Sequence, residues 1–166
     1  MAIRLADKPG VKGIYSESTI TRALAEYFDY RTQRVVVPNV GLFGWEMDLC
    51  IVSKTGVITE VEIKCSLADW QCDRDKDKWR MTAWGNVGRF YYAVPHFLAN
   101  KVPDWVADYV GVISVGTDDD GKLTKVLGVS KEARLRSKYR ASPRDIEFLF
   151  RGAHLRYWDK KTGCVA

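Results

Sequence analysis

Hydrophobic residues change their spacing several times along the chain, and each change marks an expected element of secondary structure. Near the N-terminal end, Ile20 and Leu24 recur at helical spacing. Ser16 is a suitable N-cap, and Glu17 lies in the first turn, where a negative charge is favourable. We therefore expect a helix over residues 16–28.

Short β-branched and aromatic runs predict strands after this helix. Residues 34–37 are expected to form a strand that ends at the following proline, and residues 41–44 a turn. Residues 45–52 and 57–65 are expected to pair as antiparallel strands, because only a short turn joins them. Period two in the first of these strands places its side chains on two sides: Trp45, Met47, Leu49 and Ile51 on one, and Glu46, Asp48 and Cys50 on the other.

The second half of the chain repeats this alternation of helix and strand. A capping box of the form Ser-Leu-Ala-Asp predicts a helix over residues 66–84, and an aromatic run predicts a strand over residues 88–94. Residues 110–115 and 123–129 are expected to form a hairpin, and Ser142 with the proline after it begins a last helix. That helix is expected to pack by one stripe, formed by Ile146, Leu149, Phe150, Ala153 and Tyr157.

The order of these elements predicts an α/β fold. It reads α-β-β-β-α-β, which we expect to form a mixed central sheet flanked by helices, followed by an additional hairpin and a C-terminal helix. The length of 166 residues predicts a single domain over residues 1–166, with a core at about 16–115 and an extension at about 131–166. No linker or internal repeat interrupts the sequence.

Charge is unevenly distributed. The net charge is +5, but residues 131–161 contain ten basic and four acidic residues and therefore carry +6. Such a block predicts a polyanionic partner, with DNA as the candidate, although a solvated helical face explains it equally well. The residues expected to contact nucleic-acid phosphates are Arg134, Arg136, Lys138, Arg140 and Arg144, together with Lys76 and Lys78.

Composition excludes several other classes of protein. Four cysteines without a C-x-x-C pair disfavour a disulfide scaffold or a zinc site, and two distant histidines disfavour a histidine-based centre. Phosphate-binding glycine motifs are absent from the sequence. Residues 1–13 contain no apolar run of signal-peptide length, and no run of about 18 apolar residues occurs anywhere. We therefore expect a cytoplasmic protein without a membrane partner.

The residues with the clearest chemical meaning lie on the two paired strands. Period two places Glu60, Glu62 and Lys64 on one face of the second strand, and Asp48 lies on the strand beside it. Charged side chains on an otherwise apolar strand are unfavourable unless they bind a partner or a ligand. Two carboxylates from adjacent strands suit Mg²⁺, and a lysine beside them suits phosphodiester hydrolysis. The alternative is a solvent-facing ladder of salt bridges, and the role of Glu60 stays open.

Asp48 followed by Glu62-Ile63-Lys64, within this order of elements, resembles the core of the PD-(D/E)xK nuclease superfamily. Residues 63–70, with the sequence Ile-Lys-Cys-Ser-Leu-Ala-Asp-Trp, and residues 90–95 are similar to MmcB-type DNA repair proteins and their phage relatives. The similarity covers about residues 16–115 and includes the downstream residues Asp73, Lys76, Asp77 and Lys78. Met47 stands where the motif name has proline, which weakens the recognition more than the chemistry.

The resemblance implies a restriction-endonuclease-like core and a role for each site residue. Asp48, Glu62 and the Ile63 main-chain carbonyl would hold Mg²⁺ or Mn²⁺, Lys64 would be the catalytic lysine, and Glu17 would support the site. The expected function is structure-dependent cleavage of DNA in repair or phage DNA processing, with a homodimer as a further implication. The alternatives are a catalytically inactive DNA-binding scaffold and an RNA-directed nuclease.

Asp69, Asp73 and the tryptophans admit two interpretations each. The two aspartates lie one helical turn apart, where they either shape the site or simply cap and solvate a helix. Trp70, Trp79 and Trp84 are expected in the core, whereas an exposed one would be able to stack on an unpaired base.

Overall fold

The structure, a computed structural model, describes residues 15–122 and 124–163. The segment 1–13 in which no signal peptide was expected, Leu123 of the expected hairpin and Cys164 lie outside the described residues. The helices are α1 (Glu17–Tyr27), α2 (Leu67–Cys72) and α3 (Pro143–Thr162). The strands are β1 (Val35–Leu42), β2 (Trp45–Val52), β3 (Ile58–Ile63), β4 (Arg89–Pro95), β5 (Gly111–Thr117) and β6 (Thr124–Lys131). Short 3-10 segments are η3 (Asp73–Asp75), η4 (Asp77–Arg80), η5 (Thr82–Asn86) and η6 (His96–Leu98).

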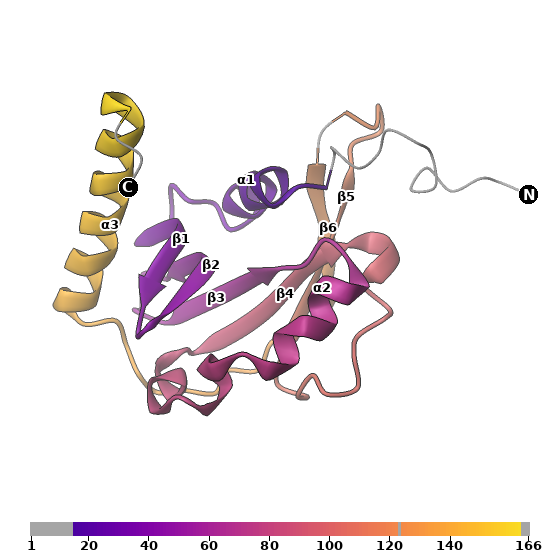
Figure 1. Ribbon diagram of the computed structural model, residues 1–166, viewed down its shortest axis with the longest axis horizontal. Coiled ribbons are helices and arrows are strands. Elements are labelled where there is room, and N and C mark those ends of the chain that lie inside the picture. Colours follow the sequence, from indigo (N-terminus) through magenta and orange to yellow (C-terminus); the bar gives the residue numbers. More distant parts are fainter. Residues whose placement is uncertain (1–14, 123, 164–166) are drawn as a thin grey trace, which may run out of the picture.

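The six strands form one sheet in the order β1-β2-β3-β4-β5-β6 (Figure 1). β1, β2 and β3 pair antiparallel, as do β5 and β6, whereas β4 pairs parallel with both β3 and β5. The crossover between β3 and β4 contains α2, as a parallel connection requires. The predicted mixed α/β architecture is confirmed, with a mostly antiparallel sheet and three helices among the described residues.

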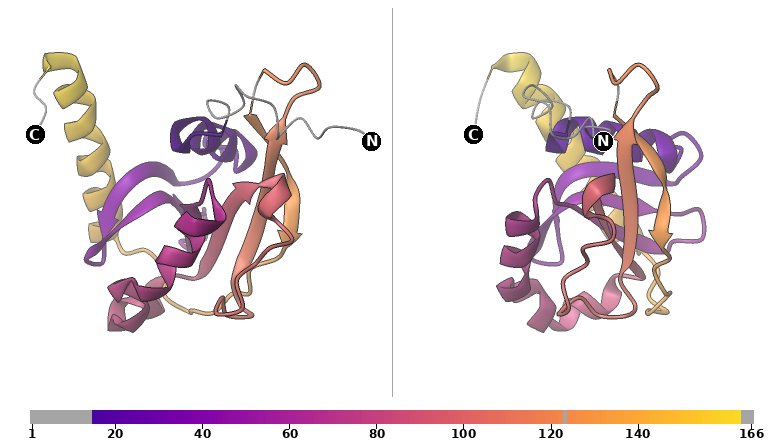
Figure 2. Two further views of the ribbon diagram at one scale, coloured as in Figure 1. Left: turned by 45° about the vertical axis from the view of Figure 1, so that its right-hand side comes forward. Right: turned by 90° about the vertical axis from the view of Figure 1, so that its right-hand side faces the viewer.

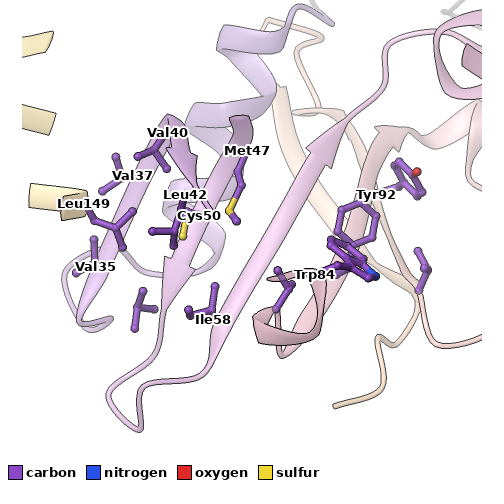
Figure 3. Close-up of a cluster of buried hydrophobic side chains, with 14 of the residues drawn as sticks. Val35, Val37, Val40, Leu42, Met47, Cys50, Ile58, Trp84, Tyr92 and Leu149 are labelled. Atoms are coloured by element: carbon purple, nitrogen blue, oxygen red, sulfur yellow. The ribbon is translucent and has the colours of Figure 1, made fainter. Parts of the chain in front are cut away.

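Each face of the sheet is covered by different helices (Figure 2). Ile20 and Leu24 of α1 pack against Leu49, Val61 and Ile113 on one face. The larger cluster on the other face contains Trp70 of α2 and Leu149 of α3, and Figure 3 shows Leu149 beside Val35 and Val37 of β1. Residues of β3 therefore alternate between two apolar layers, which explains why all six of its residues are buried.

β1 is longer than predicted. It continues through Pro38, which is paired opposite Leu49, and ends at Leu42. Proline is tolerated because β1 is an edge strand, where a backbone N–H is not needed on the outer side. The expected turn over residues 41–44 is reduced to Phe43 and Gly44, whose φ angles of 63° and 100° suit a two-residue hairpin loop.

The second helix is shorter than predicted, because α2 ends at Cys72 rather than near Trp84. The chain from Asp73 onward continues as η3, η4 and η5. This segment packs Trp79 and Trp84 edge-on against Phe90 of β4, at ring-centroid distances of 5.2 Å each. Aromatic packing onto the sheet therefore outweighs the helical preference of the sequence.

The predicted packing stripe of α3 is only partly correct. Ile146 and Leu149 are buried, and Ala153 is packed against the same cluster. Phe150 and Tyr157, however, are 56% and 55% exposed, because α3 packs mainly on the edge strand β1 and has no second layer over its outer side. Much of the helix surface is therefore apolar and exposed.

A substitution at Gly111 tests how tightly β5 packs. A Cβ atom there would lie 2.3 Å from Tyr91 Cδ1 and 2.7 Å from the Ala133 nitrogen, which is backbone and cannot turn away. We expect Gly111→Ala to lower the free energy of unfolding by about 1–3 kcal/mol, measured by urea denaturation. Gly85→Ala is the matched control, because no atom lies within 4 Å of its Cβ position. Equal midpoints for the two variants would contradict the close packing at Gly111.

Candidate active site

The charged face of β3 is the centre of the candidate site. Glu60, Glu62 and Lys64 all point to the face that carries α2, whereas Val61 and Ile63 point to the α1 face. All three charged side chains are buried. The alternation predicted for this strand is confirmed, and the solvent-facing ladder of salt bridges is excluded for these residues.

Three lysines surround the Glu62 carboxylate. Lys64 Nζ lies 2.9 Å from Oε1 and Lys78 Nζ lies 2.8 Å from Oε2, while Lys76 also donates to Oε1. Burial alone would raise the pKa of Glu62, but the lysine charges and hydrogen bonds lower it to about 2. Glu62 is therefore ionised in a place from which water is largely excluded.

Asp73 joins the same cluster from the end of α2. Its Oδ1 lies 3.0 Å from Lys64 Nζ and 2.6 Å from Lys76 Nζ, and the Tyr92 hydroxyl donates to Oδ2. The side chain is fully buried, so the interpretation of Asp73 as a solvated helix residue was wrong. Tyr92 was not anticipated, although its place in an aromatic strand beside β3 was a usable signal.

Glu60 lies deeper in the cluster. Its Oε1 accepts from Lys78 at 2.9 Å, and its Oε2 accepts from Trp45 Nε1 at 3.0 Å. Burial raises the pKa of Glu60 to about 7, with Lys78 acting in the opposite direction. Both oxygens are thus used within the protein, which gives Glu60 a structural position.

Asp48 lies where β2 separates from β3. The last paired residues are Leu49 and Val61, and Asp48 Oδ2 replaces the missing ladder bond by accepting from the Ile63 N–H at 2.7 Å. The predicted alternation of β2 fails at this point, because Met47 packs with Cys50 on the α2 face instead of with Leu49. The break in the strand directs the Asp48 carboxylate toward the edge of the charged cluster.

Repulsion between carboxylates marks the outer side of the site. Burial first, and then the charges of Glu62 and Glu17, raise the pKa of Asp48 to about 6. Glu17 is exposed at the start of α1, and Asp69, half exposed, lies 3.7 Å from Lys64. Three carboxylates, from Glu17, Asp48 and Asp69, therefore border the cluster on its solvent side.

The oxygen ligands of the site fit a divalent cation if Lys76 turns away from Glu62. Among the described residues, no three His, Cys, Asp or Glu side chains are already arranged around a common ion position. Asp48 keeps one oxygen free of the Ile63 N–H, whereas both Glu62 oxygens are occupied by lysines. Lys76 is 44% exposed and can turn into solvent, which would leave Glu62 Oε1 with Lys64 as its remaining lysine partner and with a lone pair for a cation. A cation there would relieve the repulsion that raises the Asp48 pKa.

The residues expected to contact nucleic acid do not form one surface. Lys78 is buried with Glu60 and Glu62, so its assignment to a phosphate contact was wrong. Arg136 is stacked between Trp84 and Tyr109, with its Cζ 4.5 Å and 4.6 Å from the ring centroids. The guanidinium therefore packs between two aromatic rings, and the prediction that it contacts phosphate was wrong.

The remaining basic candidates differ in whether they already have a hydrogen-bond or ion-pair partner. Lys76 is half exposed but paired with Glu62 and Asp73, and Arg140 donates to the carbonyls of Ser137 and Tyr139. Arg140 is exposed as well, as are Arg134, Lys138 and Arg144. Residues 132–142 lack helical structure, so the basic block is not one helical face either.

Comparison with known proteins gives a fold and no family. No family model matches the chain, and no curated protein matches it. A solved structure of SPO1766, a protein of unknown function from Silicibacter pomeroyi, is similar with a TM-score of 0.56 and 19% sequence identity. The similarity covers 89% of this chain and 92% of that one, so the likeness of fold extends over most of both chains. No helix in the described part of the chain is long and apolar enough to span a membrane.

Proposed function

We propose that the chain is a metal-dependent nuclease that hydrolyses phosphodiester bonds of DNA at Asp48, Glu62 and Lys64. The observation that carries this proposal is the separation of β2 from β3, which brings the Asp48 carboxylate to the edge of the buried Glu62–Lys64 pair. The resemblance to the PD-(D/E)xK nucleases includes the same three residues. A restriction-endonuclease-like core is part of the proposal.

Each residue has a distinct task. Asp48, Glu62 and the Ile63 carbonyl would hold Mg²⁺ or Mn²⁺, which supplies positive charge to the phosphate oxygens and the attacking water. Burial alone would lower the pKa of Lys64, but Glu62 and Asp73 outweigh it and raise that pKa above its ordinary value. Lys64 is therefore a permanent cation. It stabilises negative charge on the phosphate instead of removing a proton from water.

Substrate binding would use the exposed part of the basic segment. Arg134, Lys138 and Arg144 are free to contact backbone phosphates, which position a nucleic acid without reading its sequence. Because such contacts carry no information about base sequence, we infer recognition of DNA structure, as in repair or phage DNA processing. The homodimer implied by the family resemblance stays a prediction.

Cleavage of labelled nucleic acids tests the proposal. Single-stranded, nicked and branched DNA, and RNA of the same sequence, are incubated with the protein in Mg²⁺, in Mn²⁺ and in EDTA. We expect DNA to be cut in the presence of either ion and to remain intact in EDTA. Cleavage of RNA alone would support an RNA-directed nuclease, and cleavage that persists in EDTA would contradict metal dependence.

One observation favours a second function, a DNA-binding scaffold without catalysis. Glu62 is already neutralised by Lys64, Lys76 and Lys78, an arrangement that is complete without a cation. If no substrate is cut under any condition while DNA still binds, this second function is the correct one.

A further inference from the structure

A pocket beside the candidate site is lined by aromatic side chains. Its volume is about 280 Å³, and its walls include Trp79, Trp105, Tyr92 and Tyr109, with Arg74 at the rim. Pockets for whole drug-sized ligands span roughly 300–1,000 Å³. The size therefore suits a single flat heterocycle.

Hydrogen bonds hold the aromatic walls in place. Trp79 Nε1 donates to the Asp73 carbonyl at 2.8 Å, and Trp105 Nε1 donates to Gln71 Oε1 at 3.2 Å. Tyr92 is fixed by its hydrogen bond to the Asp73 carboxylate. The polar atoms of these three rings are thus hydrogen-bonded within the protein. Because Asp73 also pairs with Lys64, the pocket and the candidate site share one supporting residue.

Arg74 supplies a positive charge at the pocket. It is exposed in η3, directly after Asp73, and makes no hydrogen bond or ion pair with other residues that the structure describes. No acidic side chain is found among the described residues that line the pocket. An anionic ligand with a flat ring therefore meets both requirements of the site, whereas an apolar peptide would leave the guanidinium unused.

We propose that this pocket binds an unpaired nucleobase of single-stranded DNA, stacked on the tryptophans, with the adjoining phosphate at Arg74. Stacking on aromatic side chains accepts any base, because every base has a π face. A base that is paired within a duplex cannot enter a pocket of this kind without leaving its partner. The inference rests on the proposed function and deepens it, since it selects single strands and unpaired ends as substrates.

The test measures binding in EDTA, so that no cleavage is required. Fluorescein-labelled oligothymidylate is compared by anisotropy with an oligonucleotide of equal length that contains only abasic sites. We expect the abasic strand to bind the wild-type protein at least about fivefold more weakly, because stacking contributes roughly 1–3 kcal/mol per base and 1.4 kcal/mol is a factor of ten. Equal affinity for the two strands would overturn the proposal without the use of any variant.

Variants locate the effect in the pocket. Trp105→Ala should weaken binding of oligothymidylate about tenfold and leave the abasic strand unchanged, whereas Trp105→Phe, which keeps a ring, should bind within about threefold of wild type. Trp158→Ala is the matched control, because Trp158 is a half-exposed tryptophan on α3 and does not line the pocket. Arg74→Ala should weaken both strands and lower the salt dependence of binding. An equal loss in the Trp105→Ala and Trp158→Ala variants would contradict the assignment.

The outcomes separate this inference from the proposed function. Base-dependent binding without cleavage in any metal ion would leave the pocket assigned and the nuclease proposal wrong. Cleavage with no difference between thymidylate and abasic strands would leave the nuclease standing and remove the nucleobase pocket.

Discussion

Lys78→Met is expected to lower the free energy of unfolding by about 3–5 kcal/mol, because it leaves two buried carboxylates without their shared partner. Lys78 Nζ lies 2.9 Å from Glu60 Oε1 and 2.8 Å from Glu62 Oε2, and its side chain is 3% exposed. It also lies 4.9 Å from the ring centroids of Trp79 and Phe90, and those contacts are lost as well. Urea denaturation followed by circular dichroism measures the change.

Two comparisons establish the cause of this loss. Lys101→Met removes an exposed lysine and should change the free energy of unfolding by less than about 0.5 kcal/mol. The double variant Glu60→Gln/Lys78→Met should be more stable than the sum of its single variants predicts, because the neutral amide no longer leaves an unpaired charge. A Lys78→Met protein as stable as wild type would show that the buried ion pairs do not form.

Asp48→Asn is expected to lower the rate of DNA cleavage in Mg²⁺ at least about a hundredfold. The amide oxygen of asparagine can still accept from the Ile63 N–H, so the local backbone contact is retained while the charge is removed. Burial and the charge of Glu62 both disfavour the ionised form of Asp48. Removal of this charge should therefore leave the melting temperature unchanged or slightly raised. Single-turnover cleavage and thermal unfolding are measured on the same preparation.

Glu46→Gln is the matched control, because Glu46 is exposed on the same strand two residues earlier. It should cleave at the wild-type rate. Asp48→Asn with undiminished cleavage would remove Asp48 from the site. Lys64→Ala with undiminished cleavage would likewise remove Lys64, which the proposal uses as the cation beside the phosphate.

Sequence periodicity was sufficient to predict which side chains share a face of the central strand. It was insufficient to predict the segment after α2. Glu60, Glu62 and Lys64 share a face because alternation in a strand follows from backbone geometry alone. The turns of η3 and η4 depend instead on how Trp79 packs on β4, which is a contact between distant parts of the chain. These turns carry Lys76 and Lys78 into the cluster, so the three-lysine environment of Glu62 was not predictable from spacing.

The distribution of basic residues along the sequence did not predict which of them are exposed. Arg134, Arg136 and Lys138 are alternate residues of one basic segment, yet the structure leaves the first and last exposed and stacks Arg136 between two rings. Nothing in the local sequence indicates that Trp84 and Tyr109 converge on this side chain. The tryptophans were more predictable. Trp70 and Trp84 are buried as expected, and half-buried Trp79 packs against the same core cluster.

The proline that was expected to end the first strand has a consequence for the behaviour of the protein at high concentration. Pro38 has no N–H group, and Asn39 beside it has a left-handed φ of 47°, which bends the outer strand of the sheet. A strand from another molecule needs a straight row of free donors and acceptors before it can extend a sheet. At the β1 edge, the sheet is thereby protected against edge-to-edge growth into fibrils.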